Sequence, residues 1–185
     1  MTDPAPADVA PHRRHNRLAI AAIALVILAI GGMWIYAWFL APRGNVDRFD
    51  DRAWADAAER QCATVRAQVL ALPPASSFEG IEPKEAALTQ RAAVIDQATA
   101  LLAGQLHSLR QSEPADAKSR AGVQVWLADW DGYLESRRQQ ADRLRAGDDV
   151  EFSVVEVGGA PVTLRMDAFA TTNGMSSCVV PDDIG

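Results

Sequence analysis

One uninterrupted apolar segment constrains this chain more than any other feature. Residues 18–41 contain no charged side chain and read LAIAAIALVILAIGGMWIYAWFLA. As a helix, this segment would be about 36 Å long, enough to cross a hydrocarbon core of about 30 Å. Its C-terminal end is aromatic, with Trp34, Tyr36, Trp38 and Phe39, and such rings suit the headgroup boundary. We predict a transmembrane helix over residues 18–41, with the lipid bilayer as its partner.

A cleavable signal peptide is the closest alternative. The apolar segment is longer than the 7–15 residues typical of a signal peptide core, and no small-x-small cleavage site follows it cleanly. Arg13, Arg14 and Arg17 lie immediately before the segment, and positive charge stays on the cytoplasmic side. We therefore expect a single-pass protein of the cell membrane, with a disordered cytoplasmic tail over residues 1–17 and an extracytoplasmic domain over residues 42–185.

The charge balance excludes one large class of function. The chain carries 18 Lys and Arg against 24 Asp and Glu, a net charge of −6. Proteins that bind nucleic acid neutralise phosphates with clustered cations, so we expect no nucleic-acid partner. Residues 42–185 are enough for one hydrophobic core but hardly for two. The extracytoplasmic region is therefore predicted to be one domain.

Three apolar seams at helical spacing predict three amphipathic helices, over about residues 47–72, 83–111 and 114–146. Asp47 and Asp50 are expected to cap the first helix, Pro73-Pro74 to end it, and Gly147 to end the third. Short links between long helices favour an antiparallel three-helix bundle. The seams are Ala58, Cys62, Val65, Val69 and Leu72; Leu88, Ala92, Ile95, Thr99, Leu102, Leu106 and Leu109; and Val123, Trp126, Trp130, Tyr133, Arg137 and Leu144.

After Gly147 the apolar period changes from about 3.6 to 2. Apolar residues alternate with polar ones on both sides of Gly158-Gly159, which predicts a β-hairpin over about residues 150–166. The second predicted strand rests on Val162, Leu164 and Met166. In the tail, residues 167–185, Asp167 is expected to cap a short helix that ends at Asn173-Gly174. The fold class is thus mainly α, with a C-terminal hairpin and a tethered tail.

The tether is predicted from the cysteines. The chain has two, Cys62 in the first helix and Cys178 near its end. An even, widely spaced pair in an oxidising compartment indicates a disulfide. No second cysteine stands near either one and no C-x-x-C motif occurs, so we predict neither a metal site nor a redox centre.

Trp126, Trp130 and Tyr133 lie on one helical face, with Arg137 and Arg143 nearby. Such a face is able to hold a small anionic ligand, although aromatic stripes are more often the wide end of a core. Both interpretations stay open, and the core is favoured. Arg137 falls on the apolar seam itself, so we expect it to meet an acidic side chain.

No catalytic arrangement is evident. Asp129 and Asp131 point to different sides of a helix, and His107 has no obvious nucleophile to activate. Phosphate-binding glycine loops, H-E-x-x-H and G-x-S-x-G are absent from the sequence. We therefore predict no enzyme and no cofactor. The expected function is a non-catalytic module that binds a membrane or envelope protein or a second copy; the alternative is a small anionic-ligand-binding domain.

The C-terminal half, Asp129 to Ile184, contains a series of closely spaced motifs. They are Asp129-Trp130 with Tyr133, Arg137 and Arg143; Phe152, Gly159-x-Pro161-x-Thr163 and Asp167-x-Phe169-Ala170; and Asn173-x-Met175-x-x-Cys178 with Pro181. In these motifs the chain resembles an actinobacterial family of small single-span membrane proteins with a helical extracytoplasmic domain. The resemblance implies the same layout here, but no reaction and no ligand.

Overall fold

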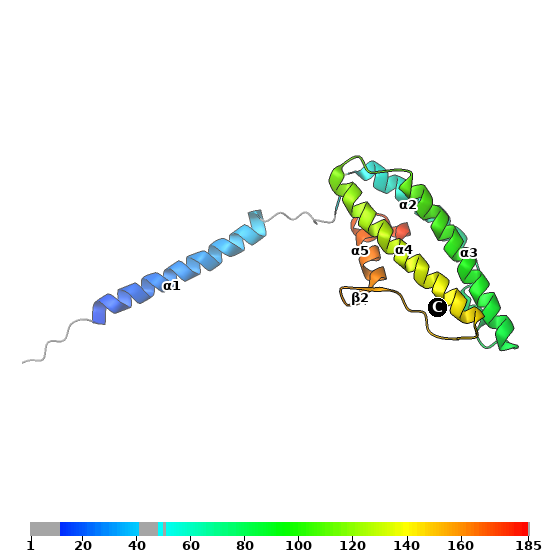
Figure 1. The fold of residues 1–185 in the computed structure, drawn as a ribbon. Coiled ribbons are helices and arrows are strands. Elements are labelled where there is room, and N and C mark those ends of the chain that lie inside the picture. Colours follow the sequence, from blue (N-terminus) through cyan, green and yellow to red (C-terminus); the bar gives the residue numbers. More distant parts are fainter. Residues whose placement is uncertain (1–11, 41–47, 50, 185) are drawn as a thin grey trace, which may run out of the picture. The chain divides into compact units, whose positions relative to one another are not determined.

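The computed structural model describes residues 12–40, 48–49 and 51–184, in two units that divide after Gly44. The first unit is the helix α1, His12–Ile35, which continues as a π-helical turn over Tyr36–Leu40 (Figure 1). The stretch Ala19–Phe39 has a mean hydropathy of 2.3 and is long and apolar enough to cross a membrane, a property that signal sequences share. The predicted apolar N-terminal helix is confirmed; its retention and orientation stay predictions.

The second unit is built on three long helices, α2 (Arg52–Leu70), α3 (Lys84–Arg110) and α4 (Ala117–Arg145). A short 3-10 turn, η2 (Ala75–Phe78), follows the predicted stop at Pro73-Pro74. α3 packs along α4 and also contacts α2 (Figure 1). α2 begins after Asp51, whose carboxylate accepts a hydrogen bond from the backbone N–H of Trp54 at 3.1 Å. The predicted caps Asp47 and Asp50 lie outside the described residues.

The predicted helical seams have the correct phase. Every seam residue of α3 and α4 is buried, and so are Ala58, Cys62 and Val69 of α2. Val65 and Leu72 are half-buried against the same core. α4 ends as expected, because Gly147 adopts a φ of +89°, which glycine tolerates without strain.

The predicted hairpin over residues 150–166 is mostly wrong. Only β1 (Glu156–Val157) and β2 (Ala160–Pro161) pair, antiparallel, with Val157 opposite Ala160 across the Gly158-Gly159 turn. Residues 150–155 form no strand, and residue 162 begins a helix, α5 (Val162–Thr172). Val162, Met166 and Ala170 are buried at i, i+4 and i+8, whereas Leu164 is 63% exposed. Burial in this segment therefore follows the spacing of a helix and not the alternation of a strand.

α5 also corrects the role predicted for Asp167. This residue lies inside the helix, and its carboxylate accepts a hydrogen bond from the backbone N–H of Val180 at 2.8 Å. α5 ends at Asn173-Gly174 as predicted, and a 3-10 turn, η3 (Ser176–Cys178), follows. α5 packs on α4, and η3 packs on α2. The 3-10 turn near the C-terminus therefore packs on a helix, α2, that precedes it by more than a hundred residues.

Candidate functional site

The aromatic stripe of α4 is part of the core. Trp126, Trp130 and Tyr133 are almost completely buried and pack edge to face, with ring centroids 6.2 Å and 5.6 Å apart. Neither indole N–H has a hydrogen-bond partner in the described part of the chain. The predicted ligand-binding face is therefore not an open surface, and the core interpretation of the stripe agrees with its burial.

Arg137 meets an acid, as expected from its place on the seam. Its guanidinium is fully buried and donates to both carboxylate oxygens of Asp183, at 2.7 and 2.6 Å. It also donates from Nε to Thr99 Oγ1 at 2.9 Å and from Nη1 to Tyr133 Oη at 3.1 Å. Burial opposes the cation, but the bonds to Asp183 and Tyr133 outweigh it and raise the pKa of Arg137. Because Asp183 occupies this guanidinium, Arg137 is not available to an anionic ligand.

Arg143, the last residue of the predicted face, lies apart from the stripe. It is half-buried, and its Nη2 donates to Oε1 of Gln140 at 2.7 Å.

Burial raises the pKa of Tyr133, so its hydroxyl stays protonated at neutral pH. The five predicted residues therefore serve packing and a buried polar network.

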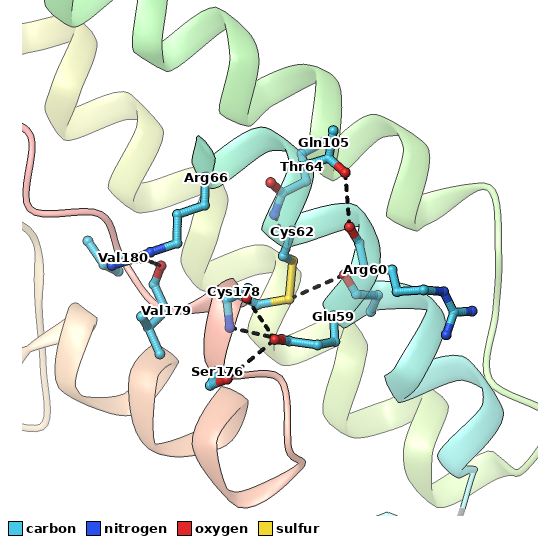
Figure 2. Close-up of a disulfide and its surroundings, with 12 residues drawn as sticks. Glu59, Arg60, Cys62, Thr64, Arg66, Gln105, Ser176, Cys178, Val179 and Val180 are labelled. Atoms are coloured by element: carbon cyan, nitrogen blue, oxygen red, sulfur yellow. Dashed lines mark hydrogen bonds between the residues drawn. A yellow bond between two sulfur atoms is a disulfide. The ribbon is translucent and has the colours of Figure 1, made fainter. Parts of the chain in front are cut away.

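The disulfide is confirmed. Cys62 and Cys178 are bonded, with Cα atoms 5.1 Å apart, inside the range that a bridge requires (Figure 2). Gln105 donates to the sulfur of Cys62 at 3.0 Å. The bridge joins α2 to a segment that we name the C-terminal strap, residues 173–184.

The strap has further anchors on both sides of the disulfide. Glu59 on α2 accepts three hydrogen bonds: from the Ser177 N–H at 2.8 Å, from the Ser177 hydroxyl at 2.7 Å and from the Ser176 hydroxyl at 3.3 Å (Figure 2). Arg66 donates to the carbonyl of Val179 at 3.2 Å. Sequence reasoning missed Glu59 and Asp183, since both lie outside the apolar seams and the strap has no periodicity.

A groove lies between α4 and α5, beside Trp126 of the stripe. We name it the α4–α5 groove; it encloses about 440 Å³. The ring of Phe169 stacks on Trp126 at 5.6 Å and contacts Phe49 at 5.8 Å. The lining residues are Phe49, Lys118, Gly122, Val125, Trp126, Asp129, Arg165, Ala168, Phe169 and Thr172. Only Trp126 belongs to the face predicted from sequence.

Two charged pairs show how the acidic residues of α4 are used. Asp129 binds Arg165 of α5 through both carboxylate oxygens, with Nε to Oδ2 at 2.7 Å, and this bond raises the pKa of Arg165. Asp131 instead pairs with Arg110 of α3 at 2.6 Å. The two carboxylates therefore bind different helices, as expected for side chains two residues apart on a helix. His107 is exposed. Across residues 12–40, 48–49 and 51–184, no three His, Cys, Asp or Glu side chains group as a metal site would require.

Comparisons with models of known protein families, with curated proteins and with solved structures gave no match. The resemblance to the actinobacterial family therefore stays a prediction.

Proposed function

We propose that this chain is a membrane-anchored, non-catalytic extracytoplasmic module that binds a membrane or envelope protein. The helices α2, α3 and α4, taken as an antiparallel bundle, form the support in this proposal. The docking surface is the arm, which we define as residues 150–164. The observation that carries the proposal is the exposure of apolar side chains along the arm while the aromatic stripe of α4 is packed.

The arm presents four exposed aliphatic side chains close together in the sequence: Val150, Val155, Val157 and Leu164. The backbone N–H of Val162 donates to the carbonyl of Val155 at 3.0 Å, so the start of α5 continues the β1–β2 pairing. Phe152 and Val154 are half-buried and pack against the core. The arm is therefore held to the domain while its other side chains face outward, an arrangement typical of interaction sites.

The charge of the arm indicates the chemistry of the partner. The arm includes two acidic side chains, Glu151 and Glu156, and no basic one. Both acidic side chains are exposed. Two copies of the arm would bring like charges together, which is unfavourable across paired strands. A different protein that offers an apolar surface flanked by Lys or Arg fits better.

Anchoring and orientation are part of the proposal. They are supported by the length of the apolar helix, by the arginines that precede it, and by the disulfide, which is typical of oxidising compartments. A reporter fused behind residue 185 tests the orientation. We expect activity from a reporter that functions outside the cytoplasm and none from one that functions inside; the reverse pattern would refute the orientation.

Site-specific crosslinking in native membranes tests the docking surface. A photoreactive side chain is placed at Val155 or Leu164, with Leu70 as control because it is similarly exposed but lies on α2. We expect the same adduct from both arm positions and none from Leu70. Leu164→Asp should abolish the adduct formed from Val155 while the thermal unfolding temperature stays unchanged. Equal adducts from Leu70, no adducts from the arm, or adducts only with a second copy would overturn this proposal.

A further inference from the structure

We propose that the α4–α5 groove is a binding site for a small amphipathic anion, meaning an apolar chain that ends in a carboxylate or phosphate group. This inference does not depend on the arm, so the two proposals fail or succeed separately. The volume of about 440 Å³ falls within the range of about 300–1,000 Å³ that small-molecule sites occupy. The lining combines aromatic rings and aliphatic side chains with a few charged groups, the composition expected of such sites.

The apolar part of the ligand would lie against Phe49, Val125 and Phe169. Phe169 is held in place from two sides, by stacking on Trp126 and by contact with Phe49. Gly122 allows this close approach, because a Cβ at this position would lie 3.2 Å from the ring of Phe169. Val125 is 55% exposed in the lining, so apolar surface remains for a ligand to cover.

The anionic group would meet cations that the protein does not fully neutralise. The ammonium of Lys118 donates to the carbonyl of Arg48 at 2.9 Å and pairs with no carboxylate within the described chain. Arg165 uses Nε and Nη2 on Asp129, and its Nη1 makes no hydrogen bond to any described residue. The groove is lined by two cations, Lys118 and Arg165, and by one carboxylate, that of Asp129. Its lining therefore has a local excess of positive charge, although the whole chain carries −6. This local excess is complementary to an anion.

The indole of Trp126 is a second observation at the groove, because it carries a hydrogen-bond donor that the described chain leaves unpaired. Trp126 lines the groove and is 1% exposed, and its indole N–H is buried without a hydrogen-bond partner. Buried polar groups are nearly always hydrogen-bonded, so the N–H of Trp126 keeps an unused capacity to donate to an acceptor next to this indole. A carboxylate or phosphate oxygen is such an acceptor.

The experiment uses the full chain in nanodiscs of phosphatidylcholine and follows the indole N–H resonance of Trp126 by NMR, assigned with Trp126→Phe. The probes are dodecanoate, dodecyl phosphate and the neutral control dodecanol. We expect a saturable shift with both anions. Dodecanol should bind with an affinity at least about tenfold lower, because it lacks one charge-assisted hydrogen bond. A shift of equal affinity with dodecanol, or no saturable shift with any probe, would overturn the inference.

Two variants separate a site from a general surface effect. Lys118→Glu should weaken dodecanoate binding at least about tenfold. Arg138→Glu makes the same charge change at another exposed position on α4 and should leave binding unchanged. Equal effects of the two variants would mean attraction to overall charge, and the inference would fail. Both residues are exposed enough for the variants to fold, which an unfolding curve checks.

An apolar chain with an anionic end group belongs either to a membrane lipid or to a free amphiphile. Nanodiscs that contain phosphatidylglycerol distinguish them. A Trp126 shift in these discs without added probe, together with loss of the response to dodecanoate, would support the proposal with lipid as the source. A response only to added dodecanoate would support it with the free amphiphile as the source.

Discussion

The most consequential single residue is Arg137, because its charge is fully buried. Burying a guanidinium is costly, and the cost is offset only by the two bonds to Asp183 and the bonds to Thr99 and Tyr133. Removing one partner leaves the other charge buried without compensation, whereas replacing both with apolar groups is often neutral. The pair therefore connects α3, α4 and the C-terminal strap in one interdependent unit.

Arg137→Met should lower the free energy of unfolding by about 3–5 kcal/mol, because Asp183 then stays buried without its cation. Adding Asp183→Leu to this variant should recover much of the loss. Urea denaturation of the single and double variants measures both effects. A double variant that is less stable than Arg137→Met alone would contradict the explanation.

Asp51 provides a pH-dependent contribution of known sign. The backbone N–H of Ala115 donates to its Oδ2 at 2.7 Å and that of Trp54 to its Oδ1, and these bonds hold the pKa of Asp51 below the ordinary 3.8. A folded-state pKa below the unfolded value means that the stabilisation is complete above pH 3.8 and is lost as the pH falls through the folded pKa.

Asp51→Asn should therefore destabilise the protein more at about pH 5 than at about pH 3, because the wild-type carboxylate is increasingly protonated at the lower pH. An amide oxygen keeps the cap to Trp54 but does not provide a second carboxylate oxygen for Ala115. Denaturation curves of both proteins at the two pH values give the comparison. A difference in stability that stays constant or grows on acidification would rule out this role.

At the scale of elements, helix phase was predictable where the apolar pattern is long. The seam of α3 spans about six turns, and no strand or alternative helical face accounts for it as well. In α5 the predicted strand is wrong, because the spacing of Val162 and Met166 fits both a strand, with its period of two residues, and a helix, where residues four apart share a face. Only Leu164 distinguishes them, and its exposure shows the helical one. Five residues are too few for periodicity to decide between helix and strand.

Leu102→Ala should cost about 2–5 kcal/mol, because this leucine is buried in the α3 seam and the truncation leaves a cavity. Leu70→Ala makes the same chemical change at an exposed position of α2 and should stay within about 0.5 kcal/mol of wild type. Thermal or chemical unfolding measures both. Similar losses at the two sites would mean that the helices do not pack as described.

At the scale of the whole molecule, the strap is the segment that joins α2 to α4. It binds α2 through Glu59, Cys62 and Arg66, and it binds α4 through the Arg137–Asp183 pair. Sequence reasoning identified the disulfide, since two cysteines allow one pairing. It did not identify the polar anchors. Asp182 and Asp183 are adjacent in a segment without periodicity, so no sequence pattern shows which of them pairs with Arg137. The α4–α5 groove was missed for a similar reason, because Phe49, Lys118 and Arg165 come from segments that no motif connects.

Cys178→Ser should lower the free energy of unfolding by about 2–5 kcal/mol, since the bridge closes a long loop between residues 116 apart. Hydrogen exchange should become faster in the strap before it does in α3. Cys62→Ser and the double variant should show the same loss, because each removes the same bond. Additive losses would mean that the cysteines contribute mainly as separate buried side chains.

The distance along the chain between the two cysteines also has a consequence for biosynthesis. A ribosome that adds about 5–20 residues per second needs about 6 to 23 seconds to proceed from Cys62 to Cys178. Throughout that interval Cys62 is an unpaired thiol on a helix whose covering segment does not yet exist. Each newly made molecule therefore passes through a period in which this thiol is open to partners from other chains, and correct pairing depends on keeping it apart from them until residue 178 arrives.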